Sequence, residues 1–301
     1  MTELRFDGRV AIITGAGGGL GRSHALLLAS RGASVVVNDI GGSVDGKGGS
    51  ATPGDAVVAE ITALGGTAIA NRDSVSTPEG GQAIVDAAMD AFGRVDIVVN
   101  NAGILRDQAF HKMESDSINA VIDVHLKGAL FVSRPAFAIM REQGYGRFIN
   151  TSSASGLFGN FGQANYGAAK AGLAGLTRVL AIEGANKGIK ANAIAPIAAT
   201  RMTQDLLGEL TELVTPESVS AVVAYLANEA CAVNGHIYSV GGGRVSRIFI
   251  GETPGTVLTE NTPEAVATSL DRIDDTDGFV TPGSLADETT IIHDALKRVS
   301  V

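Results

Sequence analysis

The chain has 301 residues, of which 45% are hydrophobic, and its formal net charge is −9. This apolar content supplies a buried core and excludes a disordered chain, while the acidic balance with scattered Lys and Arg excludes nucleic acid as an expected partner. The single cysteine, Cys231, excludes an internal disulfide and a cysteine metal cluster, so no metal is expected.

The two ends of the chain predict a cytoplasmic protein. Residues Met1–Asp7 mix charges and lack the apolar stretch of a signal peptide. No apolar run approaches the roughly 18 residues that would cross a bilayer, so no membrane insertion is expected. The last residues, Arg298–Val301, do not form the Ser-Lys-Leu peroxisomal signal.

Short Val- and Ile-rich runs alternate along the chain with stretches of helical periodicity. The runs predict strands at Arg9–Thr14, Ser34–Asn38, Thr67–Ala70, Ile97–Asn100, Arg147–Thr151, Lys190–Ile194 and Ile237–Val240. The periodic stretches predict helices at Leu20–Arg31, Asp55–Leu64, Pro78–Phe92, Ser115–Met140, Asn165–Ala185 and Pro216–Ala227. Strands that are apolar on both faces and alternate with helices predict an α/β fold with a doubly wound (Rossmann) parallel sheet. We expect a single domain over residues 1–243 and a more polar C-terminal extension over residues 244–301.

A glycine-rich turn, Thr14–Gly21, joins the first strand directly to a helix. Glycine lets the backbone turn sharply and approach a pyrophosphate, whose charge the helix N-terminus stabilises. The spacing Gly-x-x-x-Gly-x-Gly differs from the general dinucleotide fingerprint Gly-x-Gly-x-x-Gly. The turn predicts cofactor contacts at Gly15, Gly17, Gly19, Leu20 and Gly21, and a turn without a ligand is the alternative.

Polar residues follow the next strands at the same edge of the predicted sheet. Asp39 ends the second strand, where its carboxylate can bind the adenosine ribose and would repel a 2′-phosphate. Because Ile40 and Gly41 supply no cation to offset that repulsion, the cofactor is expected to be NAD rather than NADP. A Gly/Ser-rich insertion, Gly41–Gly54, comes next. Further cofactor contacts are predicted at Asp73, Ser74, Val75, Asn101, Ala102, Gly103, Pro196 and Thr200, although each alone could be ordinary turn chemistry.

Tyr166 and Lys170 lie four residues apart, on one face of a predicted helix. Tyrosine has an ordinary pKa of about 10, and the neighbouring ammonium is expected to lower the pKa of Tyr166 so that it serves as acid and base. Ser153, just after the strand Arg147–Thr151, is expected to orient the substrate oxygen. As the alcohol proton passes to Tyr166, a hydride would pass from the same carbon to nicotinamide. A Tyr–Lys pair alone is most often an ordinary surface pair, so the prediction depends on its combination with the cofactor motif.

Three motifs in this order, within Thr14–Gly21, within Asn100–Gly103, and Ser153 with Tyr166-x-x-x-Lys170, resemble the short-chain dehydrogenase/reductase family. The resemblance runs through about residue 243. It implies a homodimer or homotetramer and catalytic roles for Ser153, Tyr166 and Lys170. It also implies that Lys170, with Tyr166, contacts the nicotinamide ribose.

A narrower resemblance is to the (3R)-hydroxyacyl-CoA dehydrogenases of peroxisomal multifunctional enzyme type 2. It rests on the segments Val37–Gly42, Ala102–Asp107, Thr151–Gly156, Gly159–Tyr166, Ala195–Thr203 and Thr262–Val266. It implies a small-molecule substrate, a 3-hydroxyacyl-CoA thioester of fatty-acid or sterol side-chain β-oxidation. Related bacterial proteins also oxidise 17β-hydroxysteroids, so a steroid is an alternative. A biosynthetic 3-oxoacyl reductase would want NADPH, which Asp39 disfavours, and a non-catalytic NAD-binding scaffold is the alternative that the intact Ser–Tyr–Lys set disfavours.

Two positions depart from the wider family. His125 stands where the family usually carries the asparagine of a proton relay, and a histidine can also relay a proton. His125 is therefore included among the predicted catalytic residues, with a structural role as the alternative. Pro196 is followed by Ile197 instead of glycine. The segment Thr203–Thr215 occupies the family's substrate-lid position, and the extension 244–301 is expected to pack on the domain or on a partner subunit, a surface appendage being the alternative.

Overall fold

The computed structural model describes residues 3–46, 48, 52–199 and 212–299. The chain divides into two compact units, residues 1–247 and 248–301, and each is described by itself.

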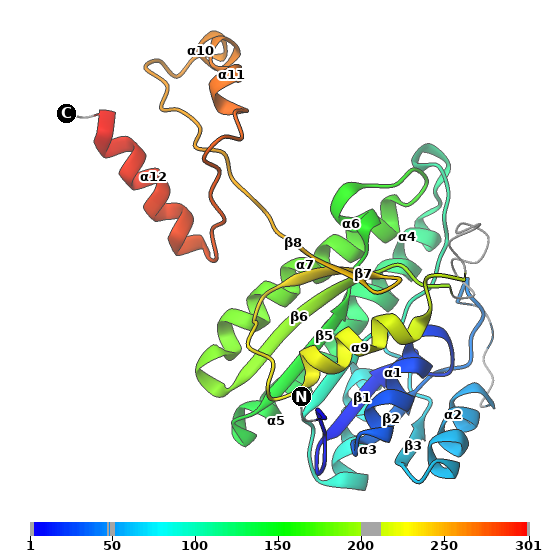
Figure 1. Cartoon of the computed structure of the whole chain (residues 1–301). Helices are drawn as coiled ribbons and strands as arrows, with labels where there is room; N and C mark the ends of the chain where they lie inside the picture. The colour runs from blue at the N-terminus through cyan, green and yellow to red at the C-terminus, as the bar shows by residue number, and fades with distance from the viewer. Residues whose placement is uncertain (1–2, 47, 49–51, 200–211, 300–301) are drawn as a thin grey trace. The chain divides into compact units, whose positions relative to one another are not determined.

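The described part of the first unit contains an eight-stranded sheet in the order β3-β2-β1-β4-β5-β6-β7-β8 (Figure 1). The strands are β1 Val10–Thr14, β2 Ser34–Asn38, β3 Thr67–Asn71, β4 Ile97–Asn100, β5 Gly146–Thr151, β6 Ile189–Pro196, β7 Ile237–Gly241 and β8 Arg244–Ile248. Neighbouring strands from β3 to β7 pair in parallel. The chain turns away from β1 in both directions, first to β2 and β3 and then to β4, and in such sheets ligands bind beyond the carboxyl ends at that point. The predicted doubly wound α/β fold is confirmed.

Helices cover both faces of the sheet (Figure 1). The α-helices described in this unit are α1 Gly19–Ser30, α2 Thr52–Ala63, α3 Pro78–Phe92, α4 Ser115–Ile122, α5 Gly128–Gln143, α6 Ala154–Phe158, α7 Ala164–Gly184 and α9 Pro216–Ala227. Side chains alternate along β1: Ala11 and Ile13 belong to the core cluster that α1, α2 and α9 complete, and Val10 and Ile12 to the cluster that α3, α5 and α7 complete. Burial on both faces explains why the strands are apolar without polar alternation.

The predicted helix Ser115–Met140 is interrupted, so that prediction was wrong in one respect. Between α4 and α5 the residues Asp123–Lys127 form a π-helical turn, which contains the buried His125. One extra residue per turn re-aims the side chains on it, and such turns are frequent at functional sites. Hydrophobic periodicity does not register a single widened turn.

The C-terminal part begins as a strand. Arg244–Ile248, which the sequence analysis assigns to the extension, forms β8 of the sheet. In the second unit the rings of Phe249 and Phe279 stack with centroids 5.6 Å apart. Its helices are α10 Pro263–Thr268, α11 Leu270–Ile273 and α12 Leu285–Val299. None of the described residues from 248 to 298 is buried, so the second unit has no buried core in this part of the chain.

Across the described residues, no helix combines the length and the apolarity that crossing a bilayer requires.

Candidate active site

The predicted catalytic residues come together at the carboxyl ends of β4 and β5. Tyr166 and Lys170 share one face of α7, and the Lys170 Nζ lies 5.5 Å from the centroid of the Tyr166 ring. Ser153 follows β5 and is the N-cap of α6, where its Oγ accepts the Ser155 backbone N–H at 3.2 Å. The Ser153 side chain lies close enough to the Tyr166 hydroxyl to lower the pKa of that phenol. An alcohol oxygen bound between the two hydroxyls would therefore meet both.

Burial controls the acidity of the Tyr166 phenol. It raises the pKa of Tyr166 above its ordinary value, the hydrogen bond with Ser153 lowers it, and the charge of Asp107 raises it again. The sequence analysis expects Lys170 to lower this pKa, and that expectation was wrong: the pKa is raised, with burial as the largest cause. Desolvation disfavours the phenolate more strongly than the hydrogen bond favours it.

Lys170 is itself buried, with 3% of its surface exposed. Its Nζ donates a hydrogen bond to the Thr151 backbone carbonyl at the end of β5. Burial lowers the pKa of Lys170 from 10.5 to about 7. A lysine in this state exchanges its proton near neutral pH, which suits a group placed beside a proton-transferring phenol.

His125 lies against the catalytic tyrosine. Its ring meets the Tyr166 ring at 89°, and its Nε2 lies 3.0 Å from the Ile104 backbone nitrogen and 2.8 Å from the Ile104 carbonyl oxygen. Nε2 accepts from the first or donates to the second according to the tautomer, and the buried Nδ1 has no hydrogen-bond partner among the described residues. Burial, with a contribution from the Lys170 charge, lowers the pKa of His125 to about 3, so the ring is neutral at physiological pH.

Gly103 is required by the position of this ring. A Cβ at residue 103 would lie 2.3 Å from the His125 Cε1. The two residues are therefore packed as a pair.

The glycine-rich turn packs closely against the loop after β4. A Cβ at Gly15 would lie 2.8 Å from the Ala102 Cα, and a Cβ at Gly21 would lie 2.3 Å from the Gly15 carbonyl oxygen. At Gly18, by contrast, a Cβ would meet nothing within 4 Å, so the outer side of the turn is open. Gly19 begins α1 with a φ of 51°, which favours glycine. A backbone that is tight inside and open outside, at a helix N-terminus, fits the pyrophosphate of a dinucleotide.

Hydrogen bonds hold the turn to the loop after β4. The Asn101 amide donates to the carbonyls of Thr14 and Gly15 at 3.0 and 3.1 Å. The Thr14 hydroxyl accepts the backbone N–H groups of Asn101 and Ala102, each at 3.0 Å. The side chain of Asn101, a predicted cofactor contact, is thus occupied in joining the two loops. Leu20 is partly buried on α1 and packs on the hydrophobic core.

Asp39 at the end of β2 is held by backbone donors. Its Oδ2 accepts the Gly17 N–H at 2.7 Å and its Oδ1 accepts the Gly41 N–H at 2.6 Å. A Cβ at Gly17 would lie 2.8 Å from the Asp39 carboxyl carbon. The carboxylate therefore lies directly beside the glycine-rich turn, where the adenosine half of a dinucleotide would be bound.

The segment after β3 is fixed by a short amide network. Asn71 donates to the Asp73 carboxylate at 2.8 Å, and Asn38 donates to the Asp73 carbonyl at 2.9 Å. Ser74 is partly buried and Val75 is buried. Asp73, Ser74 and Val75 therefore follow the carboxyl end of β3, beside the end of β2.

The predicted cofactor contacts after β6 are Pro196 and Thr200, and the predicted lid follows them. Pro196 ends β6 as expected, but Thr200 and most of the segment Thr203–Thr215 lie outside the described residues. Within the described ranges, no group of three or more His, Cys, Asp or Glu side chains is arranged to hold a metal ion.

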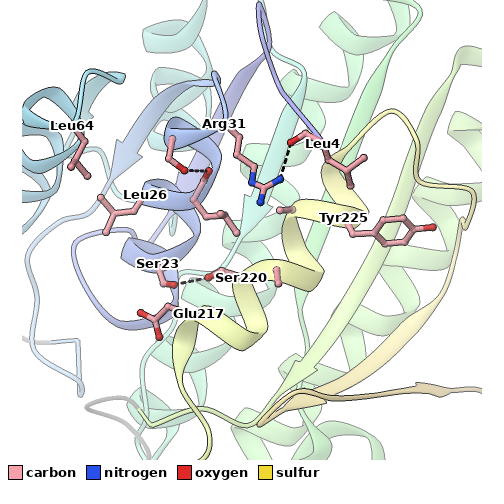
Figure 2. A pocket seen from close by; sticks show the side chains of 12 residues that line it. Leu4, Ser23, Leu26, Arg31, Leu64, Glu217, Ser220 and Tyr225 are labelled. Carbon is pink, nitrogen blue, oxygen red and sulfur yellow. Dashed lines mark hydrogen bonds between the residues drawn. The ribbon is translucent and has the colours of Figure 1, made fainter. Parts of the chain in front are cut away.

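A hollow of about 560 Å³ lies between α1 and α9, away from these residues (Figure 2). Its walls are mostly apolar, and its hydroxyls at Ser23 and Ser220 bond to one another at 2.7 Å. None of the predicted catalytic or cofactor residues lines it. The candidate active site is therefore distinct from this hollow.

Sequence reasoning gave no role to three residues that support the site. Thr14 joins two loops, the Thr151 carbonyl holds Lys170, and Asn165 bonds to the Tyr166 backbone N–H at 2.7 Å. Thr14 and Thr151 each end a strand at the ligand-binding edge, which is a signal that the sequence offered. Asn165 directly precedes Tyr166, but its other partners, Arg106 and Ser117, are 59 and 48 residues away, so the sequence could not predict these contacts.

Comparison with known proteins agrees with this geometry. The family model described as short chain dehydrogenase matches residues 9–210. Peroxisomal multifunctional enzyme type 2 of Mus musculus is 46% identical over 99% of this chain and 41% of its own length. The hydroxyacyl-CoA dehydrogenase ChsB1 of Mycobacterium tuberculosis is 38% identical over 80% of each chain. The structure of the full-length peroxisomal multifunctional enzyme type 2 of Drosophila melanogaster matches with a TM-score of 0.84 at 38% identity, over 98% of this chain and 51% of that one. The chain thus spans about half or less of the length of these multifunctional enzymes.

Proposed function

The chain belongs to the short-chain dehydrogenase family, and on that premise we propose that it oxidises the 3-hydroxyl of a (3R)-hydroxyacyl-CoA thioester with NAD. The family makes it an NAD(P)-dependent oxidoreductase acting on an alcohol, and the resemblance to peroxisomal multifunctional enzyme type 2 is confirmed. The observation that carries the proposal is the meeting of Ser153, Tyr166 and Lys170 beside the glycine-rich turn.

Each catalytic side chain has one task in this proposal. The Ser153 hydroxyl donates to the substrate oxygen and orients it. The Tyr166 phenolate accepts the hydroxyl proton, and in the reverse direction the Tyr166 phenol donates it. Lys170 stabilises the phenolate by its charge when it is protonated. Bound NAD would supply the hydride acceptor, and the protein supplies the orientation of the two reactants.

Support for NAD comes from Asp39. Its carboxylate lies beside Gly17 at the end of β2 and would repel a 2′-phosphate. Among the described residues, two arginines of neighbouring elements are paired: Arg22 of α1 with Glu60 at 2.6 Å, and Arg72, just after β3, with Asp55 at 2.6 Å. The Asp39 carboxylate, whose hydrogen-bond donors among the described residues are the backbone N–H groups of Gly17 and Gly41, therefore favours a free ribose hydroxyl.

The acyl-CoA substrate is supported by the relatives. Hydroxyacyl-CoA dehydrogenase is the named activity of the similar ChsB1. A 17β-hydroxysteroid would undergo the same oxidation of a secondary alcohol, so the substrate test includes this steroid. By resemblance to the family, we also propose a homodimer or homotetramer, which the mass of the protein in solution tests.

The deciding experiment follows NADH formation with three alcohols offered separately: a (3R)-hydroxyacyl-CoA, its 3S isomer and a 17β-hydroxysteroid. The proposal expects oxidation of the 3R isomer with NAD and its loss in Tyr166→Phe, by about 10²- to 10⁴-fold in kcat. Because the sequence contains no tryptophan, NAD binding to that variant is measured by calorimetry. The proposed function would be overturned by a preference for the 3S isomer, by a preference for NADP, or by full activity in Tyr166→Phe.

A further inference from the structure

Asn165 is buried, with 3% of its surface exposed, and all of its amide is used. Its Nδ2 donates to the carbonyls of Arg106 and Ser117 at 3.2 and 3.1 Å, and its Oδ1 accepts the Tyr166 backbone N–H at 2.7 Å. One side chain therefore joins the first turn of α7 to two segments that lie far from it in sequence. These are the segment after β4 and the start of α4.

Arg106, whose carbonyl accepts from Asn165, is itself held on two sides. Its Nε donates to the Asp45 carbonyl at 2.9 Å, and its Nη1 donates to the Asp116 carbonyl at 3.4 Å. Beside it, the Leu105 N–H donates to the Val44 carbonyl at 2.9 Å. The insertion after β2 thus extends from the Asp39 end of the site to the segment that holds α7.

We propose that Asn165 and Arg106 are positioning residues, which together form a clamp that sets the Tyr166 hydroxyl against Ser153 and Lys170. The clamp connects the glycine-rich insertion to the catalytic helix. The inference rests on the proposed function, since it assigns these residues to the step that Tyr166 performs. Neither side chain is assigned a contact with a reacting atom.

The physical reason is the cost of misplacement. Removing the Asn165 amide takes one donor from the partly buried carbonyls of Arg106 and Ser117 and the side-chain acceptor from the Tyr166 N–H, so the first turn of α7 is expected to shift. A displacement of about 1 Å at a reacting group can lower a rate by about a hundredfold. The affinity for substrate depends on other contacts and should change little.

The test compares Asn165→Ala, Arg106→Ala and Arg106→Lys with two matched controls. Asn234→Ala removes an amide that, like that of Asn165, both donates to a backbone carbonyl and accepts a backbone N–H. Its partners are the Ala181 carbonyl and the Ala191 N–H. Arg31→Ala removes a guanidinium that likewise donates to a backbone carbonyl, of Leu4. Both controls lie near the amino ends of strands, whereas the site lies at the carboxyl ends: Asn234 bonds to Ala191 near the start of β6, and Arg31 bonds to Leu4 before β1. The 301-residue chain and each of its variants are assayed with NAD and (3R)-hydroxyacyl-CoA, and the melting temperature of each variant is recorded.

We expect Asn165→Ala and Arg106→Ala to lower kcat by about tenfold to a hundredfold with KM for both substrates within about twofold. Arg106→Lys replaces the guanidinium with a single ammonium nitrogen, which can still donate to a backbone carbonyl. This variant should therefore retain more of kcat than Arg106→Ala. The controls should lower stability without lowering kcat. Equal kcat in clamp and control variants would overturn the proposal, as would a loss confined to KM.

A second readout does not need activity. The four tyrosines are labelled at Cζ, and carbon NMR assigns Tyr166 as the signal lost in Tyr166→Phe. Among the described residues, the groups that contact this ring or shift its pKa include His125, Lys170, Ser153 and Asp107. The clamp variants should move the Tyr166 signal and the controls should not. An unmoved signal overturns the clamp, whereas a parent protein that oxidises none of the three alcohols overturns the proposed function alone.

Discussion

The ring of His125 meets the ring of Tyr166 edge-on, with centroids 5.2 Å apart. The same imidazole lies within hydrogen-bonding distance of both backbone groups of Ile104. Its ring therefore connects the π-helical turn, the segment after β4 and the catalytic helix. Two separate consequences can be measured.

His125→Phe keeps an aromatic ring but removes the nitrogen that pairs with Ile104. We expect the free energy of unfolding to fall by about 1–3 kcal/mol, because a buried backbone group loses its partner. Urea unfolding at neutral pH measures this. An unchanged midpoint and slope would show that the nitrogen contributes nothing to stability.

The same variant tests whether the buried Nδ1 of His125 takes part in proton transfer. If it relays a proton, His125→Phe should lower kcat by about 10²-fold or more, since general acid–base groups contribute on that scale. His125→Gln restores a polar group and should recover part of the loss. Retention of the parent kcat in His125→Phe would leave the residue a purely structural role.

Buried histidines should make the fold sensitive to acid. Burial lowers the pKa of both His24 and His125 from 6.5 to about 3. Between those pH values the unfolded chain binds protons that the folded chain does not, so stability decreases as the pH falls through this window. Each ring contributes a slope of up to about 1.4 kcal/mol per pH unit.

Urea unfolding between about pH 4 and pH 7 measures that slope. His24→Gln should flatten it, because His24 bonds to the Ser220 Oγ at 2.7 Å away from the catalytic residues. His293→Gln is the matched control, since its side chain is 61% exposed. A slope that is identical in the parent and in His24→Gln would contradict the expectation.

Asp39 should decide the choice between the two nicotinamide cofactors. Asp39→Ser removes the negative charge beside Gly17 and should reduce the preference of kcat/KM for NAD over NADP by about tenfold or more. The absolute activity with NAD should also fall, because the backbone N–H groups of Gly17 and Gly41 lose their carboxylate partner. Asp90→Ser, which removes an exposed carboxylate from α3, serves as the charge-matched control. An unchanged preference in Asp39→Ser would show that the carboxylate does not select NAD.

The second unit should be the first part to be cut by a protease. None of its described side chains is buried, so local opening there costs little free energy. Brief trypsin treatment followed by mass spectrometry should show cleavage at Arg272 before cleavage at Arg147, which is 4% exposed in β5. Cleavage at Arg147 first would contradict this.

The sequence predicted the sheet because its signals are local. Strands such as β2 and β4 are apolar on both faces, and the glycine-rich turn lies where a strand meets a helix. Asp39, Ser153, Tyr166 and Lys170 could be predicted as site residues because each stands at a fixed place relative to such an element. Helix and strand ends differed from the predicted ones by only a few residues.

What the sequence did not predict depends on burial and on contacts across the fold. The raised pKa of Tyr166 follows from desolvation, which a Tyr–Lys spacing does not report. The contact of Asp45 with Arg106 joins residues 61 positions apart, and that of Asn165 with Arg106 joins residues 59 apart. The π-helical turn at Asp123–Lys127 differs from an α-helix only in its hydrogen bonds.

The tight packing of Gly103 on the His125 ring has an evolutionary consequence. No side chain fits at position 103 while imidazole occupies position 125, because even a methyl group would overlap the ring. Natural variation at the two positions should therefore be correlated: alanine or serine at 103 should occur only in lineages in which 125 has become smaller. A smaller side chain at 125 together with alanine at 103 should be tolerated where alanine at 103 alone is not.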